Sequence, residues 1–155
     1  MADNSHSYKT TRILAVMVIV AGVIFIAAGI GSWMAVKAQL TAENITVSDD
    51  AGRFAGQPVN GPFTAYEEAN VINKHALEAT GGKTYAELDR DDPTRQTAMT
   101  ASFLRASLFT SVLAFGVAAM AGGLGITLII IGVALGFVAK EQDEADQDKT
   151  ETAAS

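Results

Sequence analysis

Residues 13–36 read ILAVMVIVAGVIFIAAGIGSWMAV, and residues 106–139 read ASLFTSVLAFGVAAMAGGLGITLIIIGVALGFVA. Neither stretch contains a charged residue. As helices they would be about 36 Å and about 51 Å long, whereas the hydrocarbon core of a bilayer is about 30 Å thick. The second stretch is too short for two spans and a turn. The sequence therefore predicts an all-α membrane protein with two transmembrane helices, at 13–36 and 106–139.

The first stretch has an alternative interpretation as a cleaved signal sequence, because Lys9 and Arg12 precede it. Residues 36–38 also loosely resemble a cleavage site. However, the apolar stretch is about twice as long as the hydrophobic region of a signal peptide. Trp33 near its end is typical of a membrane–water interface, so we expect a retained helix.

The composition excludes several classes of function. The net charge of -6 is carried by the middle segment and the C-terminal tail, and it disfavours nucleic acid as a partner, which requires a basic surface. The chain has no cysteine, so disulfides, thiolate metal sites and iron–sulfur clusters are excluded. The expected surroundings are the lipid bilayer and other membrane proteins.

Two spans place both termini on the same side of the membrane. Lys9 and Arg12 precede the first span and Lys140 follows the second, and the positive-inside rule places such residues in the cytoplasm. The segment 37–105 is also basic near the spans, but longer loops are translocated regardless of charge. We expect a multi-pass protein of the cell membrane with residues 1–12 cytoplasmic and 37–105 extracytoplasmic.

The C-terminal tail, residues 140–155, is acidic and lacks aromatic residues. That composition is typical of disordered segments, so a disordered cytoplasmic tail is expected.

The extracytoplasmic segment is predicted to be mostly helical. Thr64 and Glu67 form a capping box that opens a helix over about 64–80, and two glycines follow it. Asp92 and Pro93 are typical of a helix start, so a second helix is expected from about residue 93 into the second span. The alternating residues Ile45–Ser48 predict a short strand.

Small residues recur in both spans at spacings that favour close helix packing. Gly22 and Gly29 lie seven residues apart in the first span, and Gly132 and Gly136 form a GxxxG pair in the second. The candidate helix–helix interface residues are Gly22, Gly29, Gly122, Gly123, Gly132 and Gly136. The pattern fits two alternatives, an interface with another chain or packing of the two spans on each other.

No catalytic, cofactor-binding or metal-binding site is predicted. Residues 81–84, Gly-Gly-Lys-Thr, lack the upstream glycine and the preceding strand of a phosphate-binding loop. His75 and Glu78 have the spacing of metal ligands on a helix, but His6 is the only other histidine. The absence of ionisable residues within the spans disfavours transport by a single chain.

Four segments of the chain resemble a family of small two-span membrane proteins of actinobacteria. They are AENITVSDDA (42–51), GPFTAY (61–66), HALEATGGKTYAELDRDDPTR (75–95) and ASFLRASLFTSV (101–112). The resemblance covers about residues 40–120 closely and the spans loosely. Members are often labelled aromatic ring-opening dioxygenases, and no activity is established for the family.

Ring-cleaving dioxygenases typically bind non-haem iron through two histidines and a carboxylate. Here the two histidines, His6 and His75, are expected on opposite sides of the membrane. The residues therefore disfavour the enzymatic label.

The sequence therefore favours the hypothesis that the protein is a non-enzymatic accessory or structural subunit of the cell envelope, or a homo-oligomer. An oligomeric channel or transport component is the alternative, and the labelled dioxygenase is a third that the chemistry disfavours.

Overall fold

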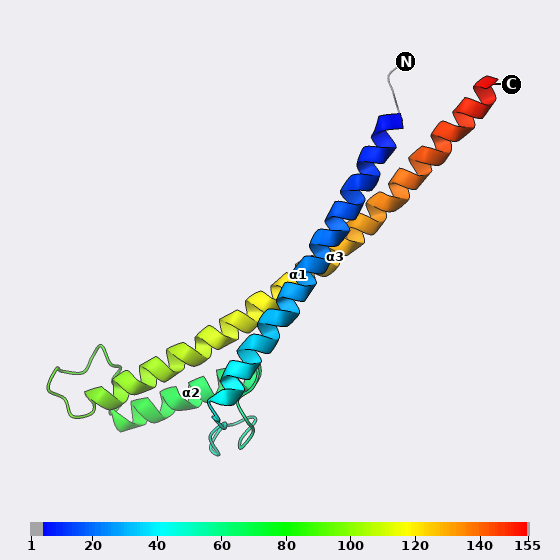
Figure 1. The fold of residues 1–155 in the computed structure, drawn as a ribbon. Coiled ribbons are helices and arrows are strands. Elements are labelled where there is room, and N and C mark those ends of the chain that lie inside the picture. The colour runs from blue at the N-terminus through cyan, green and yellow to red at the C-terminus, as the bar shows by residue number, and fades with distance from the viewer. Residues whose placement is uncertain (1–4, 155) are drawn as a thin grey trace. The chain divides into compact units, whose positions relative to one another are not determined.

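The computed structural model describes residues 5–154 and contains three helices, α1 (Ser5–Ala42), α2 (Pro62–Ala79) and α3 (Arg95–Ala154) (Figure 1). This part of the chain is all-helical, as the sequence predicts. Both α1 and α3 are long and apolar enough to cross a membrane. In the most apolar 18-residue stretch of each helix, only 17% of α1 and 11% of α3 is buried. Most of the apolar surface of both helices therefore faces outward.

The chain forms two compact units. Unit 1 comprises α1 up to Ile30 together with α3 from Ala119 onward, and unit 2 comprises Gly31–Ala118.

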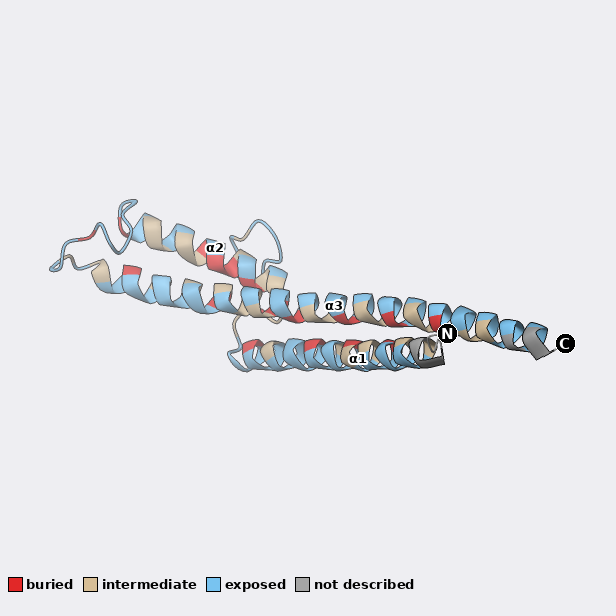
Figure 2. Ribbon diagram, turned by 90° about the horizontal axis from the view of Figure 1, so that it is seen from above, coloured by how far each residue is buried: buried red, intermediate tan, exposed pale blue. Residues whose placement is uncertain are grey.

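In unit 1, α1 and α3 pack against each other through small residues. A Cβ atom added to Gly22 would lie 2.7 Å from the carbonyl oxygen of Gly125, and one added to Gly132 would lie 2.9 Å from that of Ala15. The α1 number rises from 15 to 22 as the α3 number falls from 132 to 125, so the helices are antiparallel. A seven-residue repeat keeps the same side of each helix facing its partner, as in a coiled coil. Figure 2 shows buried residues along these facing sides.

In unit 2, a hydrophobic core joins the end of α1, the following loop, α2 and the first part of α3. Trp33 of α1 contacts Phe115 edge-on with ring centroids 4.6 Å apart, and Tyr66 of α2 contacts Phe109 at 5.8 Å. Both α1 and α2 are therefore anchored to α3 by aromatic contacts. The buried core residues are Leu40, Val47, Val59, Ala65, Ala69, Leu108 and Phe115.

The loop between α1 and α2 folds back on itself. The Val59 N–H donates to the carbonyl of Ile45 at 2.8 Å, and Thr46 and Pro58 form an isolated antiparallel bridge. Residues 45–48, which the sequence predicts as a strand, form this isolated bridge, and the Val47 N–H donates to the carbonyl of Gln57 at 2.9 Å. Asn44 and Gly56, on either side of the bridge, have φ of 52° and 70°, which are not strand conformations.

The helix α2 begins at Pro62, and proline suits the first helical position because its missing N–H is not needed there. Thr64, which the sequence places at the helix start, is instead its third residue, and its hydroxyl accepts the N–H of Gly61 at 3.3 Å. At the other end, Gly81 and Gly82 have φ of 63° and 85°, the left-handed conformation that ends many helices.

The helix α3 is continuous from Arg95 to Ala154. It includes the acidic residues 140–154, for which the composition predicts disorder. Alanine, glutamate and glutamine in this segment favour helix, and Lys140 and Glu144 form an i,i+4 ion pair at 3.5 Å. The helix α1 likewise extends through most of the predicted N-terminal tail, while residues 1–4 and 155 lie outside the described residues.

Candidate functional site

Two adjoining hollows in unit 2 form a groove along α3, here called the α2–α3 groove. One has a volume of about 510 Å³ and lies between α2 and α3, and the other has a volume of about 490 Å³ and also meets the end of α1. They share Ile72 and Leu104, so they adjoin each other at these two residues. The contribution of α3 follows helical spacing along one side: Gln96, Thr100, Leu104, Ser107 and Ser111.

The groove exists because α1 ends before α3 does in unit 2, so that part of α3 has no α1 residues beside it. Leu40, near the end of α1, belongs to the same core as Leu108, but α1 ends at Ala42. Beyond that point α2 is the helix that neighbours α3 in the described part of the chain. Ala76 of α2 and Ala101 of α3 have short side chains, so the space between the helices stays open.

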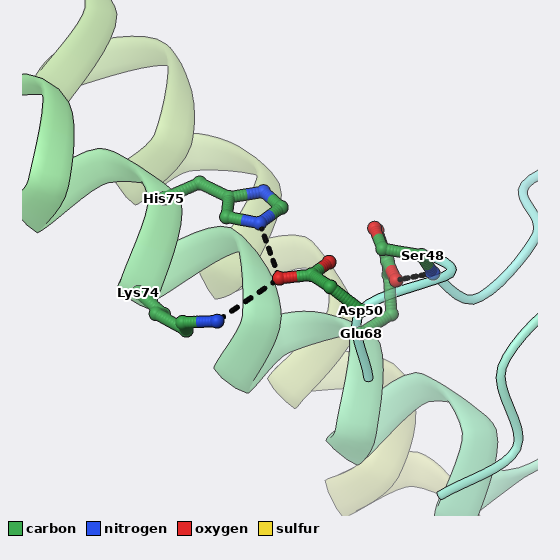
Figure 3. Close-up of polar contacts among 5 residues, drawn as sticks. All are labelled: Ser48, Asp50, Glu68, Lys74 and His75. Carbon is green, nitrogen blue, oxygen red and sulfur yellow. Dashed lines mark hydrogen bonds and ion pairs between the residues drawn. The ribbon is translucent and has the colours of Figure 1, made fainter. Parts of the chain in front are cut away.

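Polar contacts attach the loop between α1 and α2 to α2 (Figure 3). Asp50 accepts a hydrogen bond from the Lys74 ammonium at 3.0 Å and lies 2.9 Å from Nε2 of His75. The contact with His75, followed by that with Lys74, lowers the pKa of the Asp50 carboxyl below its usual value. All three side chains are largely exposed, so the contribution of each contact to stability is small.

Glu68 makes the less exposed connection between the same two segments. Its residue is only 6% exposed, and its carboxylate accepts the Ser48 N–H at 2.8 Å and the Ser48 hydroxyl at 3.1 Å. A buried carboxylate is tolerated only when such partners replace water. Because Glu68 also borders the α2–α3 groove, these bonds fix the loop beside the groove.

The structure brings together only some of the glycines that the sequence singles out as interface candidates. Gly22 and Gly132 lie in the contact between α1 and α3, and Gly29 is buried. By contrast, a Cβ added to Gly122, Gly123 or Gly136 would meet no neighbouring atom within 4 Å. These three positions therefore make no close helix contact within this chain.

Gly125 is an interface residue that the sequence analysis missed. An added Cβ there would lie 2.6 Å from the carbonyl oxygen of Gly22. The signal is present in the sequence, because Gly125 and Gly132 repeat the seven-residue spacing of Ala15 and Gly22. A search for four-residue GxxxG spacing instead selects Gly132 and Gly136.

His75, which the sequence offers as a possible metal ligand, lies on α2 beside Asp50. Among the side chains that the structure describes, no group of three histidine, aspartate or glutamate residues is placed to hold a metal ion. His75 has Asp50 as its carboxylate neighbour, but the same carboxylate binds the Lys74 ammonium, which would repel a cation.

Comparisons of the chain with protein-family models, curated proteins and solved structures found no match.

Proposed function

We propose that the chain is a two-span membrane protein and a non-enzymatic accessory subunit of a membrane assembly. In this proposal the part of unit 2 outside the bilayer binds a helix of a partner membrane protein in the α2–α3 groove.

Exposed apolar side chains support insertion of α1 and α3 in the bilayer. Ile13, Met34, Ile130 and Phe137 are each more than half exposed, and they belong to continuous apolar faces. In water such faces would be an aggregation liability, whereas lipid solvates them.

The aromatic and basic residues support a position for the membrane surfaces. Residues 13–33 of α1 correspond to about 30 Å of helix, the thickness of a bilayer core. Arg12 and Lys140 then lie at the cytoplasmic surface and Trp33 at the outer one. Before Phe115, Leu108 of α3 is buried in the core of unit 2 and Phe109 and Val112 pack against it, which accounts for part of the excess length of the second apolar block.

The continuity of the groove with the α1–α3 contact is the observation that carries the docking proposal. The side of α3 that faces α1 at Leu108 and Ser111 continues outward to Gln96 without a third helix. A helix placed there would complete a three-helix arrangement, burying Ile72 and Leu104. Small residues that line the groove, such as Ala101 and Ser107, would let the helix of a partner approach α3 closely.

Leu104→Arg and Met99→Arg form a matched pair for testing the proposal. The two side chains are on α3 and are 41% and 43% exposed, but only Leu104 lines the groove. Native mass analysis after gentle detergent extraction should find a stoichiometric complex with wild type and Met99→Arg. Leu104→Arg should lose it, and a photo-crosslinker at Thr100 should attach to the same protein.

Equal recovery of the complex with both variants would contradict docking in the groove. Recovery of this chain alone as a closed oligomer would instead favour a homo-oligomer or channel component. Gly122 and Gly123 have open space beside them, which would permit close approach of another copy. Ion or solute flux through reconstituted protein would then separate a channel from a scaffold.

A further inference from the structure

A second groove lies in unit 1, between the beginning of α1 and the part of α3 around residues 132–143. It has a volume of about 440 Å³. Its walls are apolar, with Val16 and Ile19 from α1 and Val133 from α3. Gly136 contributes no side chain, and an added Cβ there would meet open space.

Basic and hydrogen-bonding side chains surround one end of this groove. Arg12 and Tyr8 line it from α1, and Lys140 lines it from α3. Both basic side chains are exposed, and Lys140 forms an ion pair with Glu144 at 3.5 Å. Asp143 also lines this end, and Glu144 pairs with Lys140, so two positive and two negative groups lie together here.

This combination matches the chemistry of an anionic phospholipid. Guanidinium and ammonium groups bind phosphate oxygens, while a carboxylate can accept hydrogen bonds from headgroup hydroxyls. From Arg12 to Ile19 the groove extends about 10 Å along the helix, away from the basic end and into the apolar span. A headgroup at the basic end would therefore place its acyl chain against Val16, Ile19 and Gly136.

We propose that this groove binds an anionic phospholipid of the cytoplasmic leaflet, with its phosphate between Arg12 and Lys140 and an acyl chain over Gly136. Basic pockets between membrane helices on the cytoplasmic side commonly hold such headgroups. The inference rests on the proposed membrane insertion but not on the proposed partner.

Native mass analysis of the full chain tests the proposal, with phosphatidylglycerol and phosphatidylcholine supplied in equal amounts in neutral detergent micelles. The wild type should retain phosphatidylglycerol about tenfold in preference, since each cation near the surface contributes about a few-fold. Arg12→Gln with Lys140→Gln should remove the preference. Lys149→Gln is the matched control, because Lys149 is also basic and exposed on α3 but does not line the groove.

Gly136→Leu tests the acyl-chain part of the site, because the added side chain would fill the groove and leave both cations in place. It should lower retention of both lipids, whereas Gly123→Leu, at another open glycine of α3, should not. Equal retention by Gly136→Leu and Gly123→Leu would overturn the acyl-chain assignment. Equal binding of the two lipids by wild type would overturn the headgroup assignment.

Inorganic phosphate distinguishes a lipid site from a general anion site. Millimolar phosphate should not displace the retained phosphatidylglycerol, because it lacks the apolar contacts, and displacement would overturn the lipid assignment. Release of the chain from membranes by alkaline extraction would instead contradict the proposed membrane insertion, and loss of the partner complex alone would contradict docking. Each failure can therefore be recognised separately.

Discussion

Gly22 of α1 and Gly125 of α3 contact each other through their backbones, so that a Cβ added to either would lie 2.7 Å or 2.6 Å from the other's carbonyl oxygen. Real Cβ atoms do not approach oxygen so closely. The contact therefore requires glycine at both positions and determines how closely the two long helices approach in unit 1.

Gly125→Leu should separate the helices at this point and destabilise unit 1. Forcing a larger side chain into a close-packed contact costs about 1–3 kcal/mol. Thermal unfolding in detergent, followed by circular dichroism, should give a lower midpoint than for wild type. Gly123→Leu is the control, since its added side chain meets open space, and equal midpoints for the two variants would contradict the packing described.

Glu68→Ala should loosen the loop beside the α2–α3 groove. The partly buried Ser48 N–H would lose its acceptor, which destabilises this position of the loop. Hydrogen exchange should show faster exchange at the Ser48 amide. Glu78→Ala removes an exposed carboxylate from the same helix and should leave this rate unchanged, so equal acceleration in both variants would argue against the role of Glu68.

Acidification should weaken attachment of the same loop through Asp50. Its pKa is lowered in the folded protein, chiefly by the hydrogen bond with His75 and then by Lys74. The unfolded chain therefore binds more protons than the folded one in this range, and stability falls as the pH falls. The contribution is present above the ordinary aspartate pKa, about 4, and is lost as the pH falls through the lower folded value.

Limited proteolysis within residues 49–57 should accordingly become faster below about pH 4 with an acid-active protease. Asp50→Asn should show fast cleavage already at neutral pH and a weaker response to acid. Asp49→Asn, which changes the neighbouring exposed aspartate, is the control. An unchanged acid response in Asp50→Asn would assign the effect to another group.

The sequence is sufficient to predict the two long apolar helices, because continuous apolar stretches at 13–36 and 106–139 leave few alternatives. It is less informative about which glycines pack, since Gly132 fits both a four-residue and a seven-residue pattern. Only the antiparallel alignment with Ala15 and Gly22 distinguishes these patterns. That alignment depends on the segment that connects the two helices. The spacing of residues within one helix gives no information about it.

The α2–α3 groove is also not predictable from local pattern. It depends on where α1 ends relative to α3 and on the docking of Tyr66 against Phe109, both of which are long-range properties. For the acidic tail, composition alone does not distinguish a disordered segment from a helix. Its composition is typical of disorder, but its residues are also helix formers that continue a long apolar helix, and the structure has helix there to Ala154.

The most direct test of the membrane arrangement uses the absence of cysteine from the chain. Gln57→Cys places a thiol in the exposed loop of unit 2, and Gln147→Cys places one in the exposed C-terminal part of α3. Each variant would be treated with a membrane-impermeant maleimide in intact and in permeabilised cells. We predict labelling of Gln57→Cys in intact cells and of Gln147→Cys only after permeabilisation; the reverse pattern, or labelling of both in intact cells, would contradict a two-span protein with both termini in the cytoplasm.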